Sequence, residues 1–252
     1  TFKPKYIEWI KKYYYIGGMP EVVNDFVNNN DYKKARKIQE SILRAYTNDF
    51  SKHISSTGKL KIDLLWESIP NQLTQESKKF VYKKIKQGAR ADEFEEALSW
   101  LINCGLVYKI NRITKPAMPI KAYEDTKAFK LFILDVGLLC ALSKLPARTL
   151  IDGDKIFTEF NGALAEQYVL QQLKTLDDME VTYWISKSGN AEIDFVIQTD
   201  GYVIPVEVKA TTNLQAKSLK VYREKFKPEI SIRTSLADFE INNGLYNIPL
   251  FM

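Results

Sequence analysis

The chain has 252 residues, the length of one large domain or of two small ones. Hydrophobic residues make up 45% and charged residues 27%, a globular balance that excludes a disordered, collagen-like or low-complexity chain. Two cysteines, Cys104 and Cys140, and one histidine exclude a disulfide framework and zinc sites with four cysteines or several histidines. No segment reaches the roughly 18 apolar residues of a membrane-spanning helix, so we expect a cytoplasmic protein with no membrane partner.

The two halves of the chain differ in the sign of their charge. Residues 1–130 carry 24 Lys/Arg against 15 Asp/Glu, a net +9, whereas residues 131–252 carry 12 against 16, a net −4. This change indicates two domains with different partners. A basic first half is typical of nucleic-acid binding, and a slightly acidic second half suits a metal site or a basic partner. Because the chain begins with Thr1 instead of Met, we expect it to be a piece of a longer protein.

The first half is predicted to be helical up to a short ribbon. Helices are expected at residues 6–15, 20–28, 31–53 and 61–73, inside 75–87, and at 94–102. A strand at 106–110 and a second extended piece at 120–123 follow. Three helices followed by a β-ribbon is the order of a winged helix-turn-helix.

A basic stretch lies within this predicted winged helix. Residues 75–90 hold six basic side chains with Phe80 and Tyr82 interleaved: Lys78, Lys79, Lys83, Lys84, Lys86 and Arg90. One interpretation is a helix that presents these cations to the phosphate backbone of DNA. The other is a solvated face beside core aromatic residues, or an interface with a neighbouring domain, and the two are about equally favoured.

The second half has the pattern of an α/β domain. A strand is expected at 130–134, a short helix at 135–142 and a long helix at 157–175. Strands at 181–186, 192–198 and 202–209 come next, followed by a helix at 214–226 and strands at 230–234 and near the C-terminus.

Asp200-Gly201 separates two alternating apolar strands and predicts a two-residue hairpin turn. The residue numbers of two opposite residues then add up to 401, so that Asp194 faces Glu207. The side-chain period of two places both acids, with Glu192 and Lys209, on one face. The apolar face carries the expected core residues Phe195, Ile197, Ile204, Val206 and Val208.

Two carboxylates placed opposite one another are destabilising unless a cation lies between them. A divalent cation such as Mg²⁺ is the natural occupant, and Lys209 beside it would orient a water molecule or neutralise a phosphoryl transition state. The alternative is a surface hairpin with a Glu192–Lys209 pair. Pro205 inside the second strand indicates an open edge or a bulge.

Glu166 on a predicted helix, Asp194 in EIDF, and Glu207 and Lys209 in PVEVKA resemble the core of the PD-(D/E)xK nucleases. The resemblance implies a restriction-endonuclease-like fold in which Asp194 and Glu207 hold Mg²⁺ or Mn²⁺. It further implies that Lys209 assists the attacking water and that Glu166 adds an acidic contact to the metal or the water. Gln215 stands where some members carry an extra polar site residue.

Nearly the whole chain resembles the C-terminal portion of uncharacterised prokaryotic AAA-like ATPases, through segments such as YIGGMPEVV, FKLFILDVGLL and FNGALAEQYVLQQL. This resemblance implies a helical junction to a missing ATPase domain at 1–56 and a winged helix-turn-helix at 57–126. A restriction-endonuclease-like domain, a mixed sheet flanked by helices, is then expected at 127–252. The only Gly-Lys pair, Gly58-Lys59, lacks the rest of a P-loop, so ATP is expected to bind only in the missing domain.

Together these observations predict a Mg²⁺-dependent DNA phosphodiesterase module of an ATPase–nuclease protein, targeted by its winged helix. The complete set of three acids and one lysine favours this interpretation. The alternative is a non-catalytic module of an AAA-like ATPase that binds DNA or protein or serves assembly, with the nuclease-like fold as a scaffold.

Overall fold

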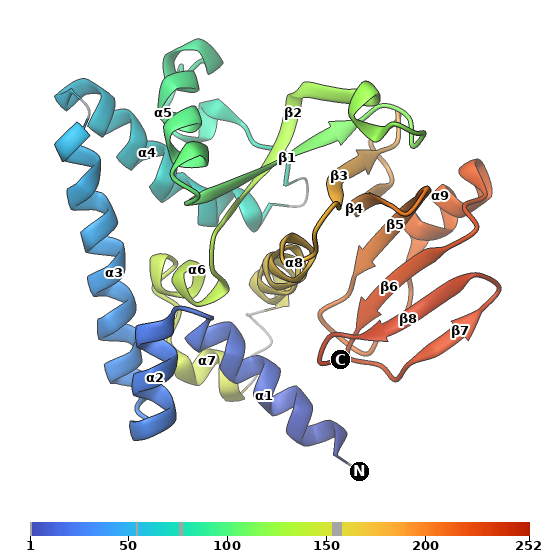
Figure 1. Ribbon diagram of the computed structural model, residues 1–252, viewed down its shortest axis with the longest axis horizontal. Helices are drawn as coiled ribbons and strands as arrows, with labels where there is room; N and C mark the ends of the chain where they lie inside the picture. The colour runs from blue at the N-terminus through green and yellow to red at the C-terminus, as the bar shows by residue number, and fades with distance from the viewer. Residues whose placement is uncertain (1, 54, 76–77, 153–157) are drawn as a thin grey trace. The chain divides into compact units, whose positions relative to one another are not determined.

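The computed structural model describes residues 2–53, 55–75, 78–152 and 158–252 (Figure 1). It is a mixed α/β structure with a helical first half and a mixed sheet flanked by helices in the second, which confirms the expected fold class. The chain forms two compact units, and each is built from two separate stretches of sequence. The helical unit comprises Thr1–Lys109 and Leu131–Gln167, and the sheet unit comprises Ile110–Lys130 and Tyr168–Met252.

The helical unit contains most of the helices that the sequence predicts. They are α1 (Lys3–Ile16), α2 (Pro20–Asn29), α3 (Tyr32–His53), α4 (Ser56–Leu73), α5 (Ala91–Asn103), α6 (Val136–Leu142) and the start of α8 (Thr158–Lys174). The unit also contains the 3-10 turn η1 (Tyr82–Lys84) and the helix α7 (Ala147–Asp152), which were not predicted from the sequence. Pro20 begins α2, a position where the missing N–H costs nothing. Asp135 is the N-cap of α6, because its Oδ1 accepts a hydrogen bond from the Leu138 N–H at 2.8 Å.

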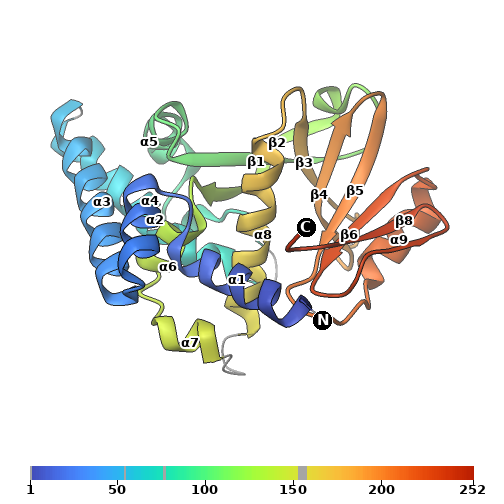
Figure 2. The same ribbon diagram turned by 60° about the horizontal axis from the view of Figure 1, so that its bottom comes forward.

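A clasp joins the end of α1 to the start of α6, which lie side by side in Figures 1 and 2. Oδ2 of Asp135 accepts a hydrogen bond from the Gly18 N–H at 2.7 Å. A Cβ atom at Gly137 would lie only 2.4 Å from the Ile16 carbonyl oxygen, and Gly17 has a positive φ of 72°. Glycine is therefore required on both sides of this contact.

The sheet unit is built on a mixed eight-stranded sheet in the order β2-β1-β3-β4-β5-β6-β8-β7. The strands are β1 (Val107–Ile113), β2 (Glu124–Ile133), β3 (Glu180–Ile185), β4 (Glu192–Thr199), β5 (Tyr202–Val208), β6 (Ser231–Ser235), β7 (Glu240–Asn242) and β8 (Leu245–Pro249). β3, β4 and β5 pair antiparallel, whereas β6 lies parallel to both β5 and β8. The ribbon strands β1 and β2 are therefore part of the same sheet.

Helix α9 (Lys217–Phe226) covers one face of this sheet (Figures 1 and 2). Leu219 and Tyr222 of α9 pack in a buried cluster with Trp184 of β3 and Val196 of β4. The Trp184 and Tyr222 rings meet edge to face with centroids 5.2 Å apart. The five residues expected in the hairpin core, Phe195, Ile197, Ile204, Val206 and Val208, are all buried, as predicted.

Two local predictions are wrong. Within the described part of 75–87, the expected helix is limited to the 3-10 turn η1, and residues 78–81 are not helical; residues 76 and 77, which fall within the same prediction, lie outside the described residues. The buried Gln72 accepts the Val81 N–H through its Oε1 at 2.6 Å, which removes that donor from a helical ladder. Residues Ile120–Tyr123, expected to be extended, form the 3-10 turn η2, where the Ile120 N–H bonds to Oε1 of Gln198.

Among the residues that the structure describes, no helix combines the length and apolarity needed to cross a membrane.

Candidate active site

The β4–β5 hairpin has the register that the sequence predicts. Its turn residues, Asp200 and Gly201, have φ values of 46° and 81°, the left-handed values of a two-residue hairpin turn. Opposite residues sum to 401 from the turn to the pair formed by Phe195 and Val206. Pro205 lies within this ladder and causes no shift in it.

Asp194 and Glu207 follow directly at the end of the ladder away from the turn. Oδ2 of Asp194 accepts a hydrogen bond from the backbone N–H of Val208 at 2.8 Å, so its carboxylate reaches onto β5 next to Glu207. Glu207 is buried, and its Oε1 lies 2.7 Å from Nζ of Lys209, whose side chain is 30% exposed. The structure thus brings together Asp194, Glu207 and Lys209, and the ammonium group of Lys209 lies against the carboxylate of Glu207.

A β-bulge at Asp194 was not predicted. Asp194 and Phe195 stand opposite a single residue of β3, because the β3–β4 register shifts by one within residues 182–184. Ile193 and Val196, which strict alternation would place on opposite faces, both pack in the cluster against α9. A bulge re-aims the side chain that it carries, and here the Asp194 carboxylate bonds the backbone of the neighbouring strand.

The expected opposition of Glu192 and Lys209 is wrong because strict alternation along β4 ends at the bulge. Glu192 lies in the part of β4 that pairs with β3, and its Oε1 is 2.5 Å from Nζ of Lys130. Lys209 binds Glu207 instead. Two ion pairs therefore replace the single cross-strand pair that the sequence indicated.

Lys130 is the residue of this region that sequence reasoning missed. Its side chain is fully buried in β2, and its Nζ lies 4.9 Å from the centroid of the Tyr183 ring as well as beside Glu192. Burial raises the pKa of Tyr183 to about 12, so its hydroxyl stays protonated. The available signal was a lysine inside the apolar run AFKLFIL, since a buried lysine needs an acidic partner.

Glu166 belongs to the helical unit, on α8. It is buried and forms an ion pair with Lys78, and the two side chains are 6% and 15% exposed. One residue expected to contact the metal and one expected to contact DNA are therefore bound to each other, an arrangement that the sequence did not indicate.

Gln215 lies in the segment before α9 and not on the helix, which begins at Lys217. Its side chain is exposed, and its backbone N–H donates to Oδ1 of Asn213 at 3.0 Å. The catalytic contribution expected of Gln215 stays a prediction.

Asp194 and Glu207 are the carboxylates that could hold a metal ion at this site. Within the described ranges of the chain, no group of three or more His, Cys, Asp or Glu side chains is arranged to bind one. Two carboxylates are nevertheless sufficient for Mg²⁺, which completes its coordination with waters and phosphate oxygens. The donor set therefore suits a hard divalent cation.

The basic segment, residues 78–90, presents most of its cations to solvent. Phe80 is buried, and the ring of Tyr82 lies 6.2 Å from that of Phe94 on α5, so aromatic side chains anchor the segment. Five of the six basic residues are exposed: Lys79, Lys83, Lys84, Lys86 and Arg90. The sixth, Lys78, is largely buried in its ion pair with Glu166. This arrangement suits contact with phosphates, which stays a prediction.

Helix α5 follows the basic segment and precedes the ribbon, the position of the recognition helix in a winged helix-turn-helix. Its sequence contains Asp92, Glu93, Glu95 and Glu96 and no basic residue. Asp92, Glu95 and Glu96 are exposed. An acidic surface repels the phosphates that line the major groove, so α5 is not suited to enter it.

The comparisons with known proteins identify two domain families. Residues 161–251 match a domain of unknown function, DUF4143. Neither of the two families is a nuclease family. No curated protein and no solved structure matches the chain. Residues 7–149, more than half of the chain, match a second domain of unknown function, and the chain therefore belongs to the family DUF8612.

Proposed function

We propose that the chain is the Mg²⁺- or Mn²⁺-dependent phosphodiesterase module of an ATPase–nuclease protein and that its substrate is DNA. One observation carries the proposal: the end of the β4–β5 hairpin brings the Asp194 carboxylate, the buried Glu207 and Lys209 together. Two carboxylates can hold Mg²⁺, and an ammonium group beside them can stabilise negative charge on a phosphoryl group, which suits metal-assisted phosphodiester hydrolysis. The ATPase domain that would supply ATP chemistry lies outside this sequence.

The residues of the site have two roles, to bind the metal and to balance charge. Asp194 and Glu207 would hold the cation, which when bound polarises a phosphoryl oxygen of the substrate. The Val208 N–H fixes the orientation of the Asp194 carboxylate. Lys209, at 2.7 Å, balances the charge of Glu207 in the metal-free protein and stands ready to stabilise negative charge on the phosphoryl group.

Thermal melts with and without Mn²⁺ test the metal site directly. Asp194→Asn keeps an oxygen to accept the Val208 N–H, and Glu207→Gln keeps the shape of the side chain, so both variants should fold. Wild type at a Mn²⁺ concentration 100 times its Kd should gain about 2.7 kcal/mol of stability. Both variants should gain little, whereas Glu229→Gln, a change at an exposed acid of the same unit, should gain as much as wild type.

Cleavage assays test the activity. DNA cleavage by the purified protein should require Mg²⁺ or Mn²⁺ and should fall to background in Lys209→Met. Lys187→Met removes an exposed lysine of the same unit and should leave cleavage unchanged. Equal cleavage by wild type and Lys209→Met, or metal melts that do not separate wild type from Asp194→Asn, would contradict the proposal.

A second candidate is a non-catalytic binding or assembly module of the ATPase, and the acidic α5 favours it. Exposed Asp92, Glu95 and Glu96 on the helix that would otherwise read DNA suit a basic protein surface. This candidate predicts that the protein neither cleaves DNA nor gains stability from Mn²⁺. It also predicts that Glu95→Lys with Glu96→Lys, which brings the net charge of α5 from −4 to zero, abolishes binding to the missing ATPase domain.

A further inference from the structure

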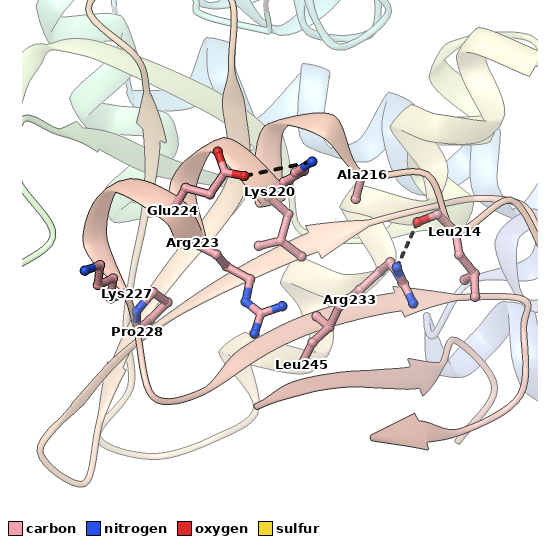
Figure 3. Close-up of a pocket in the computed structure, with 10 residues that line it drawn as sticks. Leu214, Ala216, Lys220, Arg223, Glu224, Lys227, Pro228, Arg233 and Leu245 are labelled. Carbon is pink, nitrogen blue, oxygen red and sulfur yellow. Dashed lines mark hydrogen bonds and ion pairs between the residues drawn. The ribbon is translucent and has the colours of Figure 1, made fainter. Parts of the chain in front are cut away.

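A cavity of about 550 Å³ lies in the sheet unit between α9 and the strands β6 and β8 (Figure 3). Its volume is in the range of small-molecule sites, roughly 300–1,000 Å³. Four of its lining residues are cationic and one is acidic, so the lining carries a net charge of +3: Lys220, Arg223, Lys227 and Arg233 against Glu224. None of these residues belongs to the proposed metal site.

Arg233 forms the floor of this cavity. Only 9% of the residue is exposed, and both of its hydrogen-bond acceptors are neutral oxygens. Nε donates to Oδ1 of Asn247 at 3.0 Å, and Nη1 donates to the carbonyl oxygen of Leu214 at 2.8 Å. Burial lowers the pKa of Arg233, an effect that the nearby carboxylates of Glu240 and Glu207 oppose. A bound anion would stabilise this desolvated charge.

The helix supplies the other cations. Figure 3 shows Arg223 extending from α9 toward the strands and Arg233 extending from β6 toward Leu214. The guanidinium of Arg223 donates to another neutral acceptor, the carbonyl oxygen of Asn243. The only ion pair among the described lining residues joins the exposed side chains of Lys220 and Glu224 at 3.9 Å, and such exposed pairs contribute little. Both guanidinium groups thus donate to neutral oxygens, and the carboxylates of Glu240 and Glu207 offset the charge of Arg233 without bonding to it.

The remaining lining is aliphatic. Leu214, Leu219 and Leu245 provide an apolar wall beside the two guanidinium groups. Inorganic phosphate would leave this wall exposed to water, and an apolar ligand would leave the cations without an anion. A ligand with a phosphate at one end and a flat, largely apolar ring at the other satisfies both parts of the cavity.

We propose that this cavity binds a nucleoside monophosphate, either free or as the 5′-phosphorylated end of a nucleic-acid strand. The phosphate lies against Arg223 and Arg233, and the base lies against Leu214, Leu219 and Leu245. The cavity lining contains none of Asp194, Glu207 and Lys209, so nucleotide binding here can be tested separately from the proposed nuclease activity.

Isothermal titration of the full chain with AMP, adenosine and inorganic phosphate tests the proposal. The titrations are made in EDTA so that no metal contributes. AMP should bind at one site per chain, and adenosine and phosphate should each bind at least tenfold more weakly. Absence of saturable AMP binding, or phosphate binding as tightly as AMP, would overturn the proposal.

Variants locate the binding. Arg223→Gln, and Lys220→Gln combined with Lys227→Gln, change exposed or half-exposed side chains and should weaken AMP binding at least tenfold. Lys217→Gln is the matched control, an exposed lysine of the same helix outside the cavity, and should leave the Kd within twofold. If both cavity variants bind AMP as tightly as the Lys217→Gln control does, AMP binds elsewhere and the proposal is wrong.

Two further arms identify the source of the nucleotide and separate this site from the metal site. A 5′-phosphorylated oligodeoxynucleotide that competes with AMP, while its 5′-hydroxyl counterpart does not, identifies a strand end as a ligand. Failure of both to compete identifies the free nucleotide. Asp194→Asn should bind AMP as wild type does, whatever the outcome of the cleavage assays.

Discussion

Lys78 and Glu166 form a buried ion pair between the segment after α4 and helix α8. The pair ties together a lysine that was expected to contact DNA and a carboxylate that was expected to approach a metal. Its partners are 88 residues apart in the sequence, so the contact stabilises the tertiary structure of the helical unit.

Lys78→Met should therefore act on stability more than on DNA affinity. Removing one partner of a buried ion pair typically costs about 3–5 kcal/mol, because the other charge is left without its counterion. Lys79→Met, a change at the exposed neighbouring lysine, is the control and should cost less than about 0.5 kcal/mol. Urea denaturation measures both free energies of unfolding, and equal values would show that the Lys78–Glu166 pair does not stabilise the fold.

The Lys130–Glu192 pair predicts an asymmetry between its two partners. Lys130 is fully buried whereas the Glu192 side chain is 22% exposed. Glu192→Gln should therefore cost about 3 kcal/mol or more, since it removes the carboxylate beside a buried ammonium. Lys130→Met should cost less, because Glu192 can recruit water and a methionine fills the apolar space.

The measurement for this pair is again the free energy of unfolding in urea. Lys127→Met, at an exposed position of the same strand, should change it little. A Lys130→Met variant less stable than Glu192→Gln would contradict the asymmetry.

The basic segment predicts a salt-dependent affinity for DNA. Lys83→Gln combined with Lys84→Gln removes two exposed cations and should weaken binding to any DNA sequence equally. The slope of log K against log salt concentration should become shallower by about 0.9 for each phosphate that the variant no longer neutralises. Lys33→Gln with Lys37→Gln, two exposed lysines of α3, is the matched control.

Fluorescence anisotropy at several salt concentrations gives these slopes. If both double variants change the slope equally, the basic segment does not bind the DNA, and docking of another protein becomes the better explanation for its charge.

The two cysteines should differ in reactivity. Cys104 is exposed and Cys140 is buried, and burial raises the pKa of the Cys140 thiol to about 12. A thiol reagent at pH 8 should modify one cysteine per folded chain and two in denaturant, because only the thiolate reacts. Modification of both in the folded protein would contradict the burial of Cys140.

The raised pKa of Cys140 also predicts that the folded protein loses stability at alkaline pH. The unfolded thiol ionises near pH 8.5 while the folded thiol stays protonated up to about pH 12, so the stabilisation is complete below pH 8.5 and falls as pH rises. Between wild type and Cys140→Ala, the difference in unfolding free energy should therefore shrink by about 2 kcal/mol between pH 8 and pH 10. A constant difference would rule out this linkage.

Local patterns predicted much of the fold. The Asp200-Gly201 turn specified the hairpin and its register because two-residue turns determine how the flanking strands pair. The apolar periodicity of the long helices and the short helix that follows Asp135 also depend on residues close in sequence, and both predictions hold.

The errors arise from contacts that the periodicity of a single segment does not show. The bulge at Asp194 arises in the pairing with β3, and the non-helical backbone at residues 78–81 depends on the hydrogen bond that the side chain of Gln72 accepts from Val81. The partners of Lys130 and Lys78 lie 62 and 88 residues away, beyond any spacing rule. The site residues of the hairpin could therefore be predicted from the sequence, whereas the ion pairs of Lys130 and Lys78 could not.

The clasp between Gly18 and Asp135 has a consequence for how the protein is made. These two residues are separated by 117 positions, and Asp135 lies beyond the first half, so the ribosome must release the whole first half before α6 can close against α1. Until then, α1 exposes to water and to chaperones the apolar side chains that it later buries, among them Tyr14 and Ile16. A chain interrupted before residue 135 lacks α6 altogether, and we expect quality-control proteases to remove it instead of letting it accumulate as a folded fragment.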